Sequence, residues 1–534
     1  MAPRSILLPT ATLLAVLGGG VLATSSAQAA VAVSVDRGVL TVQGDAGSDS
    51  LALRLNEAGG RVQVDVGDDG SAEFAFRRAT LDSIDVLAGD GDDQVRIDDA
   101  RGAFTTAIPT RIAGEGGDDT LLGAAGREAL EGGAGNDLAD GGGGNDVASL
   151  GDGEDAFRWD PGEGSDRVEG GAGDFDELDF NGSGANEAFQ AKAHGDRARL
   201  LRNVGNIRMD LGTLERLEVD ALGGQDKFTV GDLTGTPVND IDTDLGGDGA
   251  TDRVEVHGTP GSDFADVIGA PGDVFALGMS AMVRVRNGEP SDVLALRGRG
   301  GDDRMTAASL AASAARLEMH GDAGDDDLSG GHGNDLLTGA NGTDFIDGNG
   351  GADKANLGAQ LDIFAWDPGD GSDSVEGSTG HDVMLFRGSG DDEQFGVSAL
   401  GRRLRVTRDL GNIVMDADDV EKVEVGLRAG ADRLDVSDLG ATDVTQVVAE
   451  LSSGISGQSL DGKADRIRVE GTGGDDAITV ANTIGGVRVS GLAATVDVLR
   501  VEAALDTLTL ATLGGDDAVD QTGLAPGTIG LAVE

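Results

Sequence analysis

Residues 132–149 read GGAGNDLADGGGGNDVAS, two consecutive nonapeptides with glycine at their fourth position and aspartate at their sixth. The same register extends back to Gly114 and forward to Arg158, so five nine-residue segments follow one another, with an apolar residue at the eighth position. A fixed short period of this kind indicates a repeat architecture in which each unit buries its apolar face against its neighbours. The stretch therefore predicts a stack of short coils.

The run occurs twice. A second set of five segments starts at Gly321 in the same register, and the phrase WDPG closes each set, beginning at Trp159 and at Trp366. The second copy thus lies 207 residues after the first, the spacing between the two tryptophans. We expect the tryptophans to cover the end of each roll. Weaker single copies of the turn occur elsewhere, at Asp93, Asp226, Asp303, Asp432 and Asp517 among others.

Between these turns, apolar and polar residues alternate, as in residues 62–66 and 487–489, which is typical of β-strands. We predict an all-β protein, a parallel β-roll or β-solenoid built from nonapeptide repeats, tandemly duplicated and with β-rich flanking segments. The expected boundaries are: signal peptide 1–29, flank 30–111, first β-roll block 112–180, middle segment 181–245, flank 246–318, second β-roll block 319–387, middle segment 388–460 and flank 461–534.

Composition limits the function. The 534 residues include 96 acidic and 40 basic side chains, a formal net charge of -56, and no cysteine. A compact fold with this charge repels itself unless cations neutralise it, and nucleic acid is an unsuitable partner because phosphate contacts need basic residues.

The N-terminus predicts export. Arg4, an apolar run from Ile6 to about Leu22 and the small-residue site Ala27-Gln28-Ala29 are typical of a secretory signal peptide. No later apolar stretch approaches membrane-spanning length. A secreted chain without disulfides needs another source of stability, and a bound metal ion is the candidate.

The two runs resemble the haemolysin-type (RTX) calcium-binding repeat, G-G-x-G-x-D-x-U-x, in which U is a large apolar residue. The resemblance implies a calcium-stapled β-roll in a secreted protein. The chemistry agrees, because calcium takes six to eight oxygen ligands from carboxylates and backbone carbonyls, and glycine leaves the turn carbonyls uncovered. The residues expected to bind Ca2+ are Gly114, Gly116, Asp119, Gly132, Asp137, Gly141, Asp146, Asp155, Gly321, Asp326, Gly330, Asp335, Gly339, Asp344, Asp353 and Asp362.

Two nonapeptides should make one coil, so that segments n and n+2 stack on one edge. The carboxylates then pair as Asp119 with Asp137, Asp137 with Asp155, Glu128 with Asp146, Asp326 with Asp344, Asp344 with Asp362, and Asp335 with Asp353. Glu128 departs from the family pattern, and a cleavable signal departs from family members exported by type I machinery. Isolated aspartates such as Asp93 and Asp517 are interpreted as solvated turn residues.

No catalytic module is evident. The sequence contains no H-E-x-x-H or G-x-S-x-G motif, and its five histidines are scattered. We therefore expect a calcium-binding protein that is not an enzyme and that is secreted, either free outside the cell or associated with the cell surface. Two alternatives stay open: an adhesin or S-layer-like protein with a cell-surface or matrix partner, and a carbohydrate-active enzyme built on a β-helix.

Overall fold

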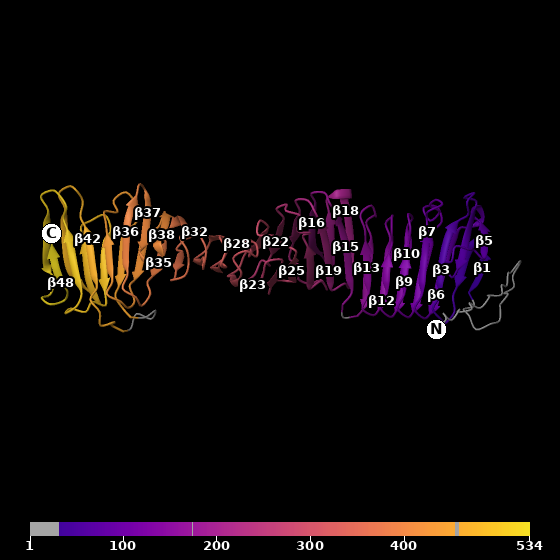
Figure 1. The fold of residues 1–534 in the computed structure, drawn as a ribbon, viewed down its shortest axis with the longest axis horizontal. Helices are drawn as coiled ribbons and strands as arrows, with labels where there is room; N and C mark the ends of the chain where they lie inside the picture. Colours follow the sequence, from indigo (N-terminus) through magenta and orange to yellow (C-terminus); the bar gives the residue numbers. More distant parts are fainter. Residues whose placement is uncertain (1–30, 174, 454–458) are drawn as a thin grey trace, which may run out of the picture. The chain divides into compact units, whose positions relative to one another are not determined.

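A computed structural model describes residues 31–173, 175–453 and 459–534. The expected signal peptide lies outside these residues. The described chain is all-β, as predicted, apart from three short 3-10 turns, and no helix in it is long and apolar enough to span a membrane. Its described residues divide into two compact units, one within 31–252 together with 280–287, and the other within 253–279 together with 288–534. Within each unit the strands lie side by side as successive rungs (Figure 1).

The first unit contains two long sheets, whose strands alternate along the chain. Its first sheet consists of β1 (Ala32–Asp36), β2 (Val39–Gln43), β6 (Ser83–Asp90), β8 (Thr110–Gly116), β10 (Glu128–Ala134), β12 (Val147–Asp152), β14 (Arg167–Ala172), β16 (Ala188–His194), β17 (Arg197–Arg202), β18 (Ile207–Gly212) and β20 (Lys227–Val230). Its second sheet consists of β3 (Ser50–Leu55), β4 (Arg61–Val66), β5 (Phe74–Arg77), β7 (Gln94–Asp98), β9 (Thr120–Leu122), β11 (Leu138–Asp140), β13 (Ala156–Trp159), β15 (Glu177–Ser183), β19 (Arg216–Leu222), β21 (Asp240–Asp244) and β25 (Met282–Arg286). Two of the 3-10 turns, η1 (Arg78–Thr80) and η2 (Val204–Asn206), also belong to it.

The second unit repeats this plan, and its strands again alternate between two sheets. The first consists of β22 (Arg253–His257), β26 (Val293–Arg297), β28 (Arg316–Ala323), β30 (Leu336–Asn341), β32 (Lys354–Gln360), β34 (Ser374–Gly380), β36 (Gln394–Leu400), β37 (Arg403–Arg408), β38 (Ile413–Asp418), β40 (Arg433–Val436), β42 (Arg466–Glu470), β46 (Thr507–Ala511) and β48 (Gly530–Val533). The second consists of β23 (Phe264–Ala270), β24 (Asp273–Leu277), β27 (Arg304–Leu310), β29 (Asp327–Ser329), β31 (Phe345–Asp347), β33 (Ile363–Trp366), β35 (Val383–Arg387), β39 (Lys422–Gly426), β41 (Gln446–Glu450), β43 (Ala477–Thr483), β44 (Gly486–Ser490), β45 (Thr495–Leu499) and β47 (Ala518–Gly523). The third 3-10 turn is η3 (Leu410–Asn412).

Each coil of a block holds two nonapeptides, as the sequence predicts. In the first sheet Leu130 of β10 lies beside Ile112 of β8, and in the second Ala139 of β11 lies beside Leu121 of β9, all in parallel register. Successive coils are therefore eighteen residues apart, twice the sequence period. The expectation that segments n and n+2 stack on one edge is confirmed.

A thin column of apolar side chains fills the space between the two sheets. Residues at the eighth position of the repeats, such as Leu121, Ala139 and Phe157, are completely buried. Trp159 is also buried, and its ring stacks on Phe180 at a centroid distance of 4.1 Å. Strand β15 pairs with β13 beyond it, so the tryptophan is an internal rung. The expectation that the tryptophans cover the end of each roll was wrong, because the coils continue past them.

The middle segments add antiparallel hairpins to the same sheets. In the first unit, β16 pairs antiparallel with β17, and β17 pairs antiparallel with β18. The second unit has the equivalent arrangement in β36, β37 and β38. Each hairpin places a buried arginine next to a buried glutamate: Arg202 Nε donates to Glu187 Oε1 at 2.7 Å, and Arg408 Nε donates to Glu393 Oε1 at 2.6 Å.

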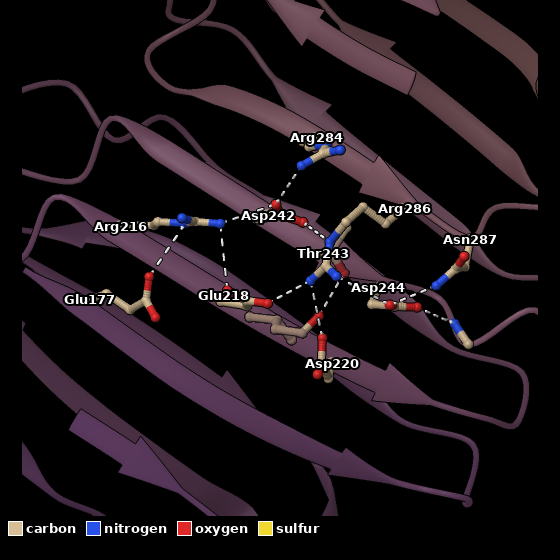
Figure 2. Close-up of polar contacts among 12 residues, drawn as sticks. Glu177, Arg216, Glu218, Asp220, Asp242, Thr243, Asp244, Arg284, Arg286 and Asn287 are labelled. Atoms are coloured by element: carbon tan, nitrogen blue, oxygen red, sulfur yellow. Dashed lines mark hydrogen bonds and ion pairs between the residues drawn. The ribbon is translucent and has the colours of Figure 1, made fainter. Parts of the chain in front are cut away.

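The outer face of the second sheet carries a network of arginines and carboxylates in the first unit (Figure 2). Arg286 of β25 donates through Nε to Asp242 Oδ1 at 2.5 Å and through Nη2 to Glu218 Oε1 at 2.6 Å. Arg216 of β19 reaches Asp242 from the other side, at 3.2 Å from its Nη2 to Oδ2. Stacked parallel strands bring like side chains close together, so arginines between the carboxylates reduce their repulsion.

Close stacking of turns predicts a sharp difference between two neighbouring glycines. Gly144 has φ +149°, and a Cβ there would lie 1.6 Å from Gly126 O, whereas a Cβ at Gly143 would meet nothing closer than 3.6 Å. We expect Gly144→Ala to lower the free energy of unfolding by at least about 1–3 kcal/mol, the typical cost of one strained backbone position. Gly143→Ala should change it little. Urea denaturation in the presence of calcium checks this, and equal losses in both variants would contradict it.

Candidate metal-binding turns

The sixth-position carboxylates form ladders that run from coil to coil. In the first block the N–H of Asp119 donates to Asp137 Oδ1 at 2.8 Å, and the N–H of Asp137 donates to Asp155 Oδ1 at 2.7 Å. On the other edge, the N–H of Glu128 donates to Asp146 Oδ1 at 2.7 Å. The structure thus brings together the three carboxylate pairs that the sequence predicts for this block.

The second block repeats the ladder. The N–H of Asp326 donates to Asp344 Oδ1 at 2.9 Å, and that of Asp344 donates to Asp362 Oδ1 at 2.8 Å. On the other edge, the N–H of Asp335 donates to Asp353 Oδ1 at 2.8 Å. One oxygen of each accepting carboxylate is therefore occupied in holding adjacent coils in register.

The second oxygen is buried and has no hydrogen-bond partner in eight of these aspartates. They are Asp119, Asp137, Asp146, Asp155, Asp326, Asp344, Asp353 and Asp362. No ion pair joins any of the eight to a basic side chain within the described residues. A buried carboxylate oxygen without a hydrogen-bond partner destabilises the fold, so a bound cation or a proton at each of these oxygens would be stabilising.

Two predicted positions differ from the rest. Asp335 Oδ2 accepts a hydrogen bond from the N–H of Gly331 at 2.6 Å, so this carboxylate is already satisfied by its own turn. In Glu128 the longer side chain lets Oε2 accept from the N–H of Ala124 at 3.4 Å, and Oε1 is buried without a partner. Asp335 therefore offers a poorer site than its sequence context suggests.

Glycine at the first position leaves room beside the unpartnered oxygen. A Cβ on Gly114 would lie 2.0 Å from Asp119 Oδ2 and 2.7 Å from Gly132 O, the carbonyl of the next coil. Gly132 and Gly339 show the same arrangement. A carboxylate oxygen and a backbone carbonyl thus border a space that any side chain would fill. Two oxygen types that calcium prefers meet there, so the residues present fit that ion.

The remaining predicted glycines fall into two groups. A Cβ on Gly141 or Gly321 would lie within 2.4 Å of the aspartate of its own turn, and Gly330 borders Asp335 in the same way at 2.8 Å. Gly116 lies further out, where a Cβ would meet only Asp90 Oδ1, at 3.4 Å. Gly116 is therefore not beside the unpartnered oxygens.

Burial raises the proton affinity of the ladder carboxylates. Desolvation raises the pKa of Asp137 and Asp344 to about 7, and of Asp146 and Asp353 to about 8. The backbone N–H that each accepts opposes this shift, and the neighbouring ladder carboxylates add to it. The pKa direction agrees with an anionic oxygen that lacks a counter-charge.

The fifth-position residues form a second ladder, which the sequence analysis did not predict. The N–H of Asp118 donates to Asp92 Oδ1 at 3.1 Å, that of Asn136 to Asp118 Oδ1 at 2.8 Å, and that of Glu154 to Asn136 Oδ1 at 3.0 Å. These bonds run in the opposite direction to those of the sixth position. The frequent Asn or Asp before the sixth-position aspartate was the available signal.

The ladders also extend beyond the regular repeats. Asp166, Asp176, Asp373 and Asp382 are buried, and each has an unpartnered Oδ2. The nine-residue register does not identify them, because insertions lengthen the spacing between ladder positions. Asp166 follows Asp146 by twenty residues and Asp176 follows Asp155 by twenty-one.

The isolated aspartates behave in two ways. Asp93 accepts at Oδ1 from the N–H of Asp49, is 3% exposed and has an unpartnered Oδ2, so its interpretation as a solvated turn residue was wrong. Asp517 also accepts, from the N–H of Asp476, but is only partly buried. Burial of the coil around it, and not its sequence context, separates Asp93 from Asp517.

A family model agrees with this geometry. The model describes the RTX calcium-binding nonapeptide repeat and matches four segments, residues 111–127, 122–157, 161–174 and 320–355. The chain carries RTX-type repeats. They coincide with the two blocks in which the unpartnered oxygens are most regular, and they support calcium binding by these turns. No curated protein matches the chain.

The pKa shifts predict how the calcium-free protein responds to pH. Because the folded pKa values of Asp137, Asp146, Asp344 and Asp353 lie above the unfolded value of 3.8, the folded state binds more protons between about pH 4 and about pH 8. Stability without calcium should therefore fall as the pH rises through this window. Urea midpoints of calcium-stripped protein should be higher near pH 5 than near pH 8.

A matched control separates this effect from general charge repulsion. The double variant Asp137→Asn with Asp344→Asn should show a weaker pH dependence. Asp118→Asn with Asp325→Asn removes two exposed neighbours that are the smallest of the causes raising the pKa of Asp137 and Asp344, so it should weaken the dependence much less. Equal slopes in both double variants would contradict the assignment to the buried ladder.

Proposed function

We propose that this protein is a secreted calcium-binding protein whose Asp/Gly turns hold Ca2+ between stacked coils and which folds when calcium binds. One observation carries the proposal: a column of eight buried carboxylate oxygens without partners, six of them in turns that begin with glycine. At Asp119, Asp137 and Asp344 the space beside the oxygen also borders a carbonyl of the adjacent coil. Calcium supplies the missing charge and bridges the coils, so metal binding and folding are coupled.

The chain neutralises its acidic residues in two ways, and only one needs an external ion. On the sheet face of the first unit, arginines such as Arg216 and Arg286 contact the carboxylates directly. The eight ladder aspartates of the blocks have no such partner among the described residues. Cations for these turns must therefore come from solution, which is consistent with the net charge of -56.

The expected energy suffices for folding to depend on calcium. Extracellular calcium modules bind with Kd values of about 10⁻⁴ to 10⁻³ M. At a calcium concentration ten times the Kd, each site stabilises the folded state by about 1.4 kcal/mol. Six such sites contribute roughly 8 kcal/mol, similar to the total stability of a typical domain, about 5–15 kcal/mol.

Calcium-rich surroundings outside the cell suit this design, and the expected signal peptide would deliver the chain there. In this proposal the protein is not an enzyme, and calcium serves folding and stability.

The direct test compares the protein with and without calcium. We expect the far-UV circular dichroism of calcium-stripped protein to lose much of its β-signal at about pH 8 and to regain it on calcium addition. Magnesium at the same concentration should be a weaker substitute, because it demands a smaller, octahedral site. An equal β-signal in chelator and in calcium would refute calcium-driven folding.

A pair of neighbouring residues tests the site itself. Asp326→Asn keeps the Oδ1 acceptor but replaces the unpartnered oxygen by an amide, so it should abolish most of the stabilisation that its site gains from calcium, about 2.7 kcal/mol at 100 times the Kd. Asp327→Asn is the control, because its side chain is 48% exposed. Asp326→Asn should be less stable than Asp327→Asn in calcium but not in chelator, where the asparagine removes an unpartnered buried charge. Equal stability of both variants in calcium would count against the site.

A further inference from the structure

The ladder of the second unit begins before the segments that the RTX model matches. The N–H of Asp263 donates to Asp303 Oδ1 at 2.7 Å, and the N–H of Asp303 donates to Asp326 Oδ1 at 2.8 Å. The turns containing Asp263 and Asp303 have similar sequences, GTPGSD at 258–263 and GRGGDD at 298–303. They therefore provide two successive turns of the same design, both outside residues 320–355.

The two aspartates differ at their second oxygen. Asp263 Oδ2 accepts from the N–H of Thr259 at 2.6 Å, and the Thr259 hydroxyl lies 3.2 Å from the same oxygen. Asp303 is 2% exposed, and its Oδ2 has no hydrogen-bond partner. We call a turn closed when its own backbone N–H satisfies this oxygen, as at Asp263, and open when the oxygen is left without a partner, as at Asp303.

The residue at the second position decides between the two states. In the open turn this residue is Arg299, in the left-handed region at φ +79°, and its N–H does not reach Asp303. In the closed turn it is Thr259, which is not among the residues with positive φ. The sign of φ at this position sets which side of the turn the N–H faces, and so whether the carboxylate is satisfied internally.

The same relation holds along both units. Second-position residues of open turns all have positive φ: Gly89, Glu115, Gly133, Gly142, Gly151, Gly162, Gly171, Leu222, Arg299, Asp322, Ala340, Asn349, Gly358, Gly369, Ser378 and Arg428. Gly171 precedes its aspartate, Asp176, by five residues, and the others precede theirs by four. Second-position residues without positive φ donate their N–H to the turn's own carboxylate: Asp45, Ala124, Ser183, Thr259, Gly331, Ser389 and Thr472.

Arg299 makes the open turn costly in a calcium-free protein. A left-handed conformation is unfavourable at a residue with a side chain, and the unpartnered buried oxygen adds to that cost. Both costs occur in the same turn. A cation at Asp303 Oδ2 would offset them together.

The space for such an ion is present. A Cβ on Gly298 would lie 1.9 Å from Asp303 Oδ2 and 2.7 Å from Gly321 O, which closely matches Gly114 in the first block, at 2.0 Å and 2.7 Å from the equivalent atoms. Asp93, Asp226 and Asp432 also lie in open turns, but the first position is alanine or leucine there, at Ala88, Ala221 and Leu427. Of the four buried isolated aspartates, only Asp303 combines an open turn with a first-position glycine.

We propose that Asp303 and Gly298, which lie outside the matched repeats, form a further calcium site with the Gly321 carbonyl of the next coil, and that Asp263 binds no ion. The left-handed backbone at Arg299 keeps this turn open. At Asp263 the Thr259 N–H occupies the carboxylate, and Arg299 Nη1 lies 3.5 Å from Gly258 O, the carbonyl of the first-position glycine of that turn. The assignment rests on the proposed function, because it extends calcium binding by the blocks to a new turn.

Native mass spectrometry of the full chain in calcium tests the assignment by counting bound ions. We expect Asp303→Asn to bind one ion fewer than the wild type, and Asp263→Asn to bind the same number. Asp344→Asn, in the second block, should also bind one ion fewer. If Asp303→Asn misfolds, Arg299→Thr provides the test, because it gives this turn the closing residue of the other and should also remove one ion.

The outcomes separate the two claims. A wild-type protein that binds no calcium would refute the proposed function. Loss of an ion in Asp344→Asn together with unchanged counts in Asp303→Asn or Arg299→Thr would overturn the Asp303 site alone. Loss of an ion in Asp263→Asn would overturn the rule that a closed turn excludes calcium.

Discussion

A buried carboxylate that is half satisfied controls this structure. One oxygen of each ladder aspartate accepts a backbone N–H from the adjacent coil and fixes the register, as between Asp119 and Asp137. The other is out of contact with water and, in the open turns, has no partner. Because an unpartnered buried anion is unfavourable, the same group that aligns the coils also makes their stacking depend on a proton or a metal ion.

The middle segments show what happens where the chain supplies its own cation. Glu187 and Glu393 occupy ladder positions, since the N–H of each donates to the next carboxylate, Asp226 or Asp432. Each of the two glutamate carboxylates accepts a backbone N–H from its own turn and contacts a buried arginine. The arginine also lies over a tryptophan ring, 5.3 Å from the ring centroid in the first unit and 5.6 Å in the second. Arginine there takes the electrostatic place that calcium is proposed to take in the blocks.

The division between open and closed turns explains why the repeat pattern alone predicts some calcium sites wrongly and overlooks other unpartnered carboxylates. Asp335 lies in a well-formed nonapeptide, yet Gly331 closes its turn. Asp93 lies outside the regular runs, yet it is buried and unpartnered. Both differences come from the backbone conformation four residues before the aspartate and from the coil packed against it. Neither can be deduced from the fixed Gly and Asp positions.

The sequence by itself determined the coil of two nonapeptides, the duplication, the inward apolar position and the carboxylate pairs, because a strict period leaves few ways to stack. Tertiary structure decided which oxygens are unpartnered, that Trp159 is an internal rung, and that the fifth position forms its own ladder. These depend on the sign of φ at single residues such as Gly331 and Arg299 and on contacts across coils. Glycine and non-glycine residues occur on both sides of that division, so local composition does not encode it.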